Sequence, residues 1–461
     1  SRIYAKFNSA HFLAQNVLFR IISEFSNSVG TIGVNNEKIN FLYDAVPLSL
    51  KILNKYYTLS IPKSFYDGLH HLNEVLIDFL LKNKQKPNTS KSILMTEFDP
   101  IKHSELFLSS SKSTVNFIFF NKRRPAVWNL KSYQIIRNSK AKLAKYHSIL
   151  DSDLKKIIYF EKHSIYNIIN SLISDEKTLQ NFFSINNTSF WNVIKSAFIE
   201  LCKKRMIDGI ETIHVVKKIF HTYNFSSVLI WNENGFNELI IIKIAKKFNI
   251  PIVLLQHGLY YDSAESLNDN KFSGILPIYS DNIIVWGNVF ERYLENLGIE
   301  QWKIMKLGSP LFDKLFNKLS QLDKTHDEYV LLALNPPTQN YVSDLTVESK
   351  KNYENTILRI CESLSKLQKR VLIKLHPSAK DIDIKNFEKI YRNIELIKGE
   401  NIIPLIESCS IFVCLDLSTS ILIAQILNKP TISIITNYKM LGKSEIFKSN
   451  STLLTNIDEF K

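Results

Sequence analysis

Polar residues at the end of an apolar run are the first sign of chemistry in this sequence. The run at 252–255, Ile-Val-Leu-Leu, is typical of a buried strand and ends in Gln256, His257 and Gly258. Ligands of open parallel sheets bind beyond the carboxyl ends of the strands, so we expect these residues to face a cleft. An imidazole with a pKa of about 6.5 suits a general base, and glycine permits close backbone approach to a ligand. The structural alternative is a capped strand end.

A second apolar run ends in the same way. Lys374 belongs to this run, and His376 and Pro377 follow it. If the strand neighbours the one that contains Cys414, the imidazole reaches the same phosphate group as the hydroxyl residues that follow Cys414. A structural hydrogen bond is the alternative for a lone histidine.

Small hydroxyl residues open a predicted helix. Ser418, Thr419 and Ser420 follow an apolar strand pattern and precede an apolar helix pattern. Hydroxyls and free backbone N–H groups at a helix N-terminus suit a phosphate group, and simple capping of the helix is the structural alternative, which this segment taken alone favours. Gly308 and Ser309 end another strand and enter a helix, so they either offer N–H groups to the cleft or form a structural turn.

Two carboxylates also follow apparent strands. Glu97 comes after a short apolar run, and Glu233 comes shortly after Val-Leu-Ile-Trp. Either could deprotonate a substrate hydroxyl, whereas a solvated loop carboxylate is the alternative.

The glycines exclude two common nucleotide-binding loops. None of the 12 glycines builds Gly-x-Gly-x-x-Gly or a Walker A loop. A dinucleotide dehydrogenase or a P-loop enzyme is therefore disfavoured, and any nucleotide must be held differently.

Strands and helices alternate from residue 228 onward, which predicts an α/β architecture. The strand patterns are apolar throughout, as expected for parallel strands covered on both faces. We expect two Rossmann-like, doubly wound parallel sheets that face a cleft. The predicted strands are 228–231, 252–255, 283–286, 304–307, 330–334, 371–375, 394–397, 411–415 and 431–435, with 93–95 and 115–120 before them.

The sequence predicts three parts. An N-terminal extension, mostly helical, occupies 1–90. An acceptor domain occupies 91–320 and contains a helical insertion at about 132–223. A nucleotide-donor domain occupies 328–461, and its end at Lys461, just inside a helix-like pattern, indicates a truncated piece.

Composition sets the broad class. A chain of 461 residues with 45% hydrophobic and 22% charged residues is globular and long enough for two or three domains. Its formal net charge of +14 favours an anionic partner such as nucleic acid, a membrane surface or a phosphorylated substrate, although lysine-rich coding produces the same excess. The four cysteines lack metal or disulfide spacing, and no secretory leader or spanning segment is visible. We therefore expect reduced thiols in a cytoplasmic protein.

The order of these motifs resembles that of bacterial and archaeal surface-polysaccharide glycosyltransferases of the GT-B fold. The similar families include the CDP-glycerol glycerophosphotransferases, the capsule Kdo-transferases and the polysialyltransferases. The resemblance covers about residues 228–435 and depends on the succession Gln-His-Gly, Val-Trp-Gly, Gly-Ser-Pro, Lys-Leu-His-Pro and Asp-Leu-Ser-Thr-Ser. Residues 1–227 match no motif of these families.

The resemblance implies an inverting, metal-independent transferase without a cofactor. It implies transfer of a sugar or polyol phosphate from a nucleotide-activated donor, CMP- or CDP-linked rather than UDP-linked, to a surface glycan or lipid-linked acceptor. The basic surface would then contact an anionic membrane at its inner face, and no nucleic acid partner is expected. The candidate donor-binding residues are His376, Lys374, Pro377, Ser418, Thr419, Ser420, Gln425, Gly308 and Ser309; the acceptor-side residues are Gln256 and Gly258; the candidate catalytic residues are His257, Glu233 and Glu97.

Two departures keep alternatives open. Many GT-B enzymes hold a ribose with a glutamate where Gln425 stands here, which leaves room for a non-catalytic nucleotide-sugar-binding protein. A UDP-sugar 2-epimerase-like enzyme shares the two-domain fold and the His-Pro strand end. Its Asp-Ser-Gly-Gly phosphate loop is missing from 416–420, which argues against it.

Overall fold

The computed structural model describes 13 ranges of the chain. Described residues of 45–48, 59–230 and 234–252 form one compact unit, and those of 49–58, 231–233 and 253–460 form a second. The described ranges are 45–52, 55–81, 91–185, 188–189, 191–260, 262, 266–318, 329–335, 347–376, 390–397, 400–436, 444–448 and 451–460.

The first sheet is parallel in each strand pair whose register is known, and its strand order is β11-β10-β9-β8-β3-β4-β5. Its strands are short, and their side chains are buried because both faces of the sheet are covered. Leu94, Met95, Phe119 and Phe120 are almost fully buried. The order reverses beside β3, so β3 and β8 flank a topological switch point. The strands are β3 (Ser92–Thr96), β4 (Asn116–Phe120), β5 (Ala141–Leu143), β8 (Phe225–Ile230), β9 (Ile252–Leu255), β10 (Asn282–Val285) and β11 (Ile304–Lys306).

The second sheet belongs entirely to the second unit and has the order β14-β13-β12-β15-β16-β17. All of its pairs are parallel, and the order reverses between β12 and β15, as in a Rossmann domain. The strands are β12 (Tyr329–Ala333), β13 (Arg370–Lys374), β14 (Ile394–Ile397), β15 (Ile411–Leu415), β16 (Thr431–Ile434) and β17 (Thr452–Thr455).

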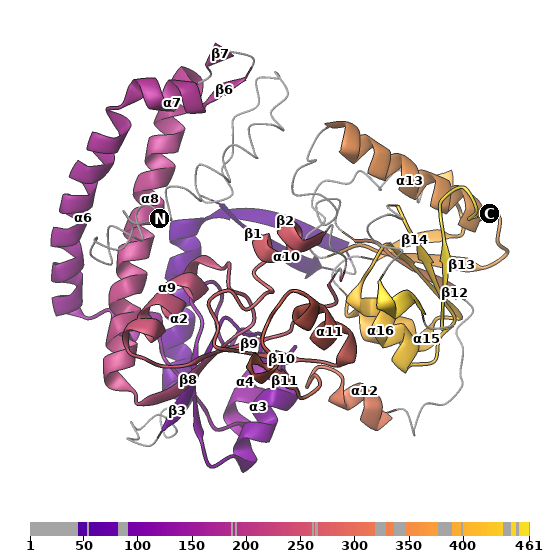
Figure 1. Cartoon of the computed structure of the whole chain (residues 1–461), viewed down its shortest axis with the longest axis horizontal. Coiled ribbons are helices and arrows are strands. Elements are labelled where there is room, and N and C mark those ends of the chain that lie inside the picture. Colours follow the sequence, from indigo (N-terminus) through magenta and orange to yellow (C-terminus); the bar gives the residue numbers. More distant parts are fainter. Residues whose placement is uncertain are drawn as a thin grey trace. The chain divides into compact units, whose positions relative to one another are not determined.

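Helices cover both faces of the second sheet. Alternation along β12 sends Leu331 to one face and Leu332 to the other, and each joins a separate apolar cluster. Helix α13 (Val347–Ser365) packs on the Leu332 side, whereas α15 (Ile402–Ser408) and α16 (Thr419–Ile426) pack on the Leu331 side (Figure 1). Two Rossmann-like parallel sheets confirm the predicted GT-B type of fold class.

Helices dominate the stretch predicted as an insertion. Helix α8 is long, and α6 packs along it through a buried cluster that contains Trp191 and Phe198. Strand β5 lies in the same stretch but joins the first sheet; three residues are too few for a recognisable strand pattern. The helices of the first unit are α2 (Lys63–Leu81), α3 (Ser104–Ser109), α4 (Leu130–Asn138), α5 (Tyr146–Ile149), α6 (Ser152–Ile173), α7 (Glu176–Phe182), α8 (Trp191–Thr222) and α9 (Phe236–Lys247), and β6 (Ser184–Ile185) pairs with β7 (Thr188–Ser189).

The described part of the predicted N-terminal extension is not wholly helical. Strands β1 (Ala45–Ile52) and β2 (Lys55–Pro62) form a two-stranded sheet before α2. The second unit adds α10 (Leu267–Phe272), α11 (Asn288–Asn296) and α12 (Asp313–Lys318). Among the described helices, none is both long enough and apolar enough to cross a lipid bilayer. All four cysteines are buried free thiols.

Candidate active site

The turn from β15 into α16 is held in an unusual backbone conformation. Asp416 is fully buried and has a φ of 58°, in the left-handed region that few non-glycine residues adopt. Its carboxylate accepts hydrogen bonds from the backbone N–H of Thr436 at 2.7 Å and from the Thr436 hydroxyl at 2.9 and 2.8 Å. Because these bonds compensate for burial, the carboxylate fixes the turn rather than facing a ligand.

The three hydroxyls at the start of α16 have different partners. Ser418 is the N-cap: its Oγ accepts the N–H of Ser420 at 3.4 Å and lies 2.8 Å from the Ser420 Oγ. Thr419 Oγ1 accepts the backbone N–H of Leu259 at 3.1 Å. Helix capping therefore occurs, as the structural alternative predicted. Capping is compatible with anion binding, because the N-terminal N–H groups and the helix dipole remain in place.

Asn335 supports the same turn and was missed by sequence reasoning. It lies just beyond β12, is buried, and its Nδ2 donates to the carbonyls of Leu415 at 2.6 Å and Leu417 at 3.1 Å. Tyr353 of α13 in turn donates its hydroxyl to the Asn335 carbonyl. The rule that singled out His257, a polar residue just after a buried strand, would have found Asn335. The switch point of the second sheet is therefore a braced loop.

His376 lies farther from this turn than the sequence suggested. Its strand, β13, does not neighbour β15, because β12 pairs with both of them. With a strand spacing of about 4.8 Å, β13 and β15 lie roughly 9.6 Å apart. The expectation that the two strands are adjacent is wrong; strand order follows from how the crossover helices pack, which local sequence does not encode. Pro377 lies outside the described residues.

Burial lowers the pKa of two basic side chains, one on β13 and one just after it. Lys374 is 5% exposed, its Nζ donates to the Leu375 carbonyl at 2.9 Å, and burial lowers its pKa. Burial and, secondarily, the Lys374 ammonium group lower the pKa of His376 below 6.5. A dianionic ligand would reverse both effects, since it favours the charged forms.

The remaining donor-side residues have structural partners. Gln425 of α16 donates its Nε2 to Thr452 Oγ1 at 3.0 Å, which ties α16 to β17. Gly308 has a φ of 82°, so a side chain there would be strained, and its N–H donates to the Val285 carbonyl at 3.3 Å. Ser309 Oγ accepts the N–H of Leu311 at 3.3 Å. Their roles toward a donor stay predictions.

The loop after β9 is fixed by Gln256. This buried amide donates its Nε2 to the Gly258 carbonyl at 2.9 Å and accepts the Trp286 N–H at 2.8 Å. The Trp286 indole donates to the Gln256 carbonyl at 2.9 Å. A Cβ at position 258 would lie 3.5 Å from Thr419 Oγ1, an ordinary contact, so space alone does not require glycine there. Gln256 therefore positions the histidine that follows it.

The imidazole of His257 lies among aromatic rings. The centroid of its ring is 5.3 Å from the ring centroid of Trp231 and 5.4 Å from that of Tyr260, and both contacts are edge-to-face. The His257 backbone N–H donates to the Tyr260 hydroxyl at 3.2 Å. Burial raises the pKa of Tyr260, so its hydroxyl stays neutral and can accept that bond. These contacts fix the imidazole on a rigid support, as a general base requires.

The carboxylate of Glu233 binds a backbone segment that lies far from it in the sequence. It is 1% exposed, and its carboxylate accepts the N–H groups of Ile278 at 3.0 Å, Tyr279 at 2.9 Å and Ser280 at 2.7 Å. Burial is the main cause that raises the pKa of Glu233, while the hydrogen bonds oppose it. Since backbone donors occupy both oxygens, the geometry favours a positioning role over direct proton transfer; its role as a base stays a prediction.

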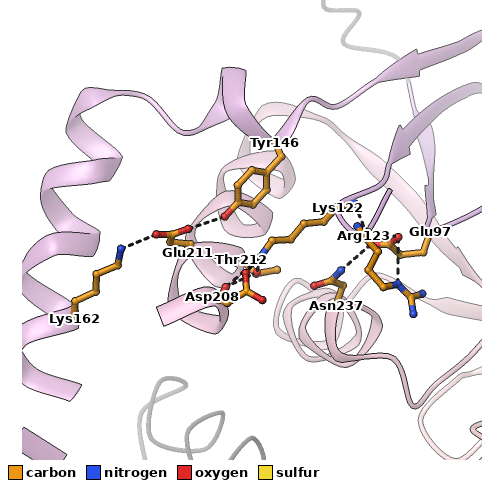
Figure 2. A network of polar contacts seen from close by, with 9 residues as sticks. All are labelled: Glu97, Lys122, Arg123, Tyr146, Lys162, Asp208, Glu211, Thr212 and Asn237. Carbon is orange, nitrogen blue, oxygen red and sulfur yellow. Dashed lines mark hydrogen bonds and ion pairs between the residues drawn. The ribbon is translucent and has the colours of Figure 1, made fainter. Parts of the chain in front are cut away.

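Glu97 is the corresponding buried carboxylate at the end of β3 (Figure 2). It has a φ of 57° and accepts the N–H groups of Lys122 at 3.0 Å and Arg123 at 3.2 Å, and the Asn237 amide at 2.7 Å. Arg123 also pairs with the fully buried Glu238. The Arg123 guanidinium thus forms ion pairs with two buried carboxylates. The hydrogen bonds of Glu97 to Lys122 and Arg123 fix the loop after β4.

The network extends from that loop to the long helix α8, as Figure 2 shows. Lys122 contacts Asp208 and Thr212 of α8. Glu211, on the same helix, accepts the Tyr146 hydroxyl at 3.1 Å and pairs with Lys162 at 2.6 Å. Sequence reasoning missed the Lys-Arg-Arg run at 122–124, although only Asn121 separates it from the buried strand β4.

A family match decides the classification. The model of the family described as LIC12162 family transferase matches residues 50–447, which is most of the chain. The chain belongs to the LIC12162 transferase family. No curated protein matches this family member significantly. The match establishes a transferase and leaves the donor and acceptor to be inferred from the site.

Solved structures resemble this LIC12162-family chain at low identity. UDP-GlcNAc 2-epimerase from Neisseria meningitidis, bound to UDP-GlcNAc, is 13% identical over 80% of this chain and 88% of its own, with a TM-score of 0.46. Arabidopsis thaliana UGT89C1, complexed with UDP-L-rhamnose, is 11% identical over 80% and 86%, with a TM-score of 0.42. Acinetobacter baumannii MurG is 6% identical over 81% and 88%, with a TM-score of 0.37. At such values they say nothing about the substrate of this chain.

Proposed function

We propose that this family member is a metal-independent, inverting GT-B glycosyltransferase or polyol-phosphate transferase that uses a nucleotide-activated donor. The observation that carries the proposal is the braced turn at the switch point of the second sheet, where α16 begins. Ligands of doubly wound sheets bind at such switch points, beyond the carboxyl ends of the strands. The family match supports a transfer reaction.

The turn is suited to the diphosphate of a donor. Ser418 supplies a hydroxyl, and the first N–H groups of α16 supply donors along the helix axis. Asn335 and Thr436 hold the turn from opposite sides, so it needs no rearrangement when an anion binds. Preorganised donors of this kind stabilise the charge that develops on a leaving phosphate.

Two basic groups on β13 and just beyond it would complete the donor site. Lys374 ends β13 and His376 follows it, on the other side of β12 from β15, and burial lowers the pKa of both side chains. In this arrangement one phosphate of a nucleoside diphosphate would contact α16 and the other would contact His376. Binding would then restore the charge of His376 and strengthen the contact.

On the acceptor side, His257 is the preferred base. Its imidazole lies between the rings of Trp231 and Tyr260, whereas the carboxylates of Glu97 and Glu233 accept hydrogen bonds from backbone N–H groups and are positioned by them. It would take the proton of an acceptor hydroxyl as the donor bond breaks, so that the anomeric configuration inverts. We propose a surface glycan or lipid-linked acceptor and a CMP- or CDP-linked donor. The net charge of +14 supports contact with an anionic membrane at its inner face.

Two variants of the N-cap separate capping from phosphate binding. Asp, Asn and Ser cap helices about equally well, so Ser418→Asp and Ser418→Asn both preserve α16. The added carboxylate repels a phosphate, whereas the amide does not. Thermal shifts with CMP, CDP, UDP and GDP should show stabilisation of the wild type and of Ser418→Asn by at least one diphosphate, and none for Ser418→Asp. Equal stabilisation of both variants would place the nucleotide elsewhere, and no shift with any nucleotide would refute nucleotide binding.

A further inference from the structure

Three metal-ligating side chains meet in the first unit, among residues that play no part in the proposed donor site. His71 and Glu74 lie three residues apart on α2, and His147 belongs to α5. One ligand atom from each of the three lies within 4.8 Å of the other two. Residues three apart on a helix project from the same face, so α2 presents both of its ligands toward α5.

Direct contacts hold the three residues in this arrangement. The imidazole centroids of His71 and His147 are 4.6 Å apart, and their planes are tilted by 53°. The backbone N–H of His147 donates to Glu74 Oε2 at 3.1 Å, which fixes the carboxylate beside the second imidazole. The carboxylate is mostly buried, with a side-chain exposure of 12%, whereas His71 is exposed. A cation can therefore enter from the His71 side.

Neighbouring groups support the ligands. His70 is 4% exposed, and its Nε2 lies 3.7 Å from Glu74 Oε1, so it can orient the carboxylate from behind. The ammonium group of Lys145, which lies near Glu74, forms an ion pair with Asp78.

We propose that His71, Glu74 and His147 bind one divalent transition-metal ion, for which Zn²⁺ is the probe. Two imidazoles and one carboxylate form a donor set that zinc uses with a fourth position left open. Calcium and magnesium are disfavoured, because they prefer oxygen ligands only. Tetrahedral zinc ligands lie about 3.3 Å apart, so side-chain shifts of about 1 Å complete the site.

The ion would fasten α2 to α5. These elements are more than 60 residues apart in the chain, and the ion would connect them through three bonds. Its ligands belong to the first unit and none of them is a residue of the proposed donor site, so the ion would stabilise the first unit. Binding to the folded state alone raises thermal stability in proportion to the logarithm of free metal concentration.

The test uses the full chain after chelator treatment and dialysis. Isothermal titration with ZnCl₂ should show one site in the wild type, and Zn²⁺ should raise its melting temperature. His71→Ala removes an exposed ligand without disturbing the core, and we expect at least a tenfold weaker affinity and a smaller thermal shift. His147→Ala should show the same loss. His163→Ala is the matched control, because it removes an exposed histidine of α6.

Co²⁺ gives a second readout that does not depend on stability. Its visible absorption should report a low-coordinate site in the wild type and in His163→Ala, and should be lost in His71→Ala. The proposal is overturned if the wild type binds no Zn²⁺, or if His71→Ala and His147→Ala both bind it as tightly as His163→Ala.

Discussion

The backbone N–H of Leu259 donates a hydrogen bond to Oγ1 of Thr419 at 3.1 Å. This bond joins the loop that carries His257 to the first residue of α16, and both segments belong to the second compact unit. The proposed base and the proposed phosphate-binding turn are therefore coupled through one side chain. Thr419 still has a hydroxyl proton to donate, so it can contact a donor phosphate while it accepts from Leu259.

Replacing Thr419 by valine should test this connection. Thr419→Val keeps the branched shape but removes the acceptor, so the Leu259 N–H loses its partner. We expect the free energy of unfolding in urea to fall by about 1 kcal/mol. Thr356→Val is the control: the Thr356 hydroxyl donates to Asn352 within helix α13, and its loss should change stability by less than about 0.5 kcal/mol. Equal effects of the two variants would mean that the Leu259 bond contributes nothing specific.

Two glycine variants should have opposite effects on stability. Gly308 has a φ of 82° and no atom within 4 Å of an added Cβ, so Gly308→Ala costs backbone strain only, about 1 kcal/mol. Gly68 also has free space, but it lies inside helix α2. Gly68→Ala should therefore raise stability by about 0.5–1 kcal/mol. If Gly308→Ala is as stable as the wild type in urea, the backbone conformation of the turn after β11 does not require glycine.

The buried carboxylates near Arg123 predict a large effect. Arg123→Met leaves Glu97 and Glu238 buried without their guanidinium, and we expect a loss of about 3 kcal/mol in unfolding free energy. Arg124 is the matched control, because its 3.6 Å pair with Asp99 is partly exposed, and Arg124→Met should cost less than about 1 kcal/mol.

A double variant identifies the cause of that loss. Adding Glu238→Gln to Arg123→Met removes one of the two buried charges that lost the guanidinium, so part of the stability should return. If it does not, packing of the arginine side chain rather than charge explains the effect.

The proposed role of His376 predicts a pH dependence of nucleotide binding. Burial and the Lys374 ammonium group hold the pKa of His376 below 6.5, so the free protein carries a neutral imidazole near pH 7. A diphosphate favours the imidazolium form, and binding therefore takes up a proton. Affinity should rise as pH falls from about 7.5 to 5.5, by roughly tenfold more in the wild type than in His376→Gln. The ratio between the two proteins cancels the titration of the ligand itself; a ratio that stays constant with pH would exclude His376 as a phosphate ligand.

The sequence predicted the fold class and the strand ends because both depend on local pattern. Continuous apolar runs identified nearly every strand of the second sheet, and the hydroxyls at Ser418 to Ser420 marked the start of α16. Strand order was not predictable in this way. The insertion of β12 between β13 and β15 separates His376 from Ser418, and only the packing of helices on the sheet determines it.

Long-range backbone contacts explain the other limits. Glu97 and Glu233 stand at strand ends as predicted, yet their partners are N–H groups many residues away, such as Lys122 and Ser280. Nothing in the local sequence of a carboxylate reveals such donors. His71 and His147 escaped notice for the same reason, since α2 and α5 bring them together from separate parts of the chain.

The central claim is that this chain transfers a group from a nucleotide-activated donor at the turn before α16. Its most direct test is release of nucleotide from CMP-, CDP-, UDP- and GDP-linked donors, measured with and without a lipid-linked glycan acceptor. We predict that one donor class is turned over with transfer to the acceptor, and that His257→Gln lowers the rate by about 100-fold or more while the nucleotide still binds. Ser418→Asp should abolish turnover. Conversion of the donor to an epimer, or no nucleotide release from any donor, would contradict the account.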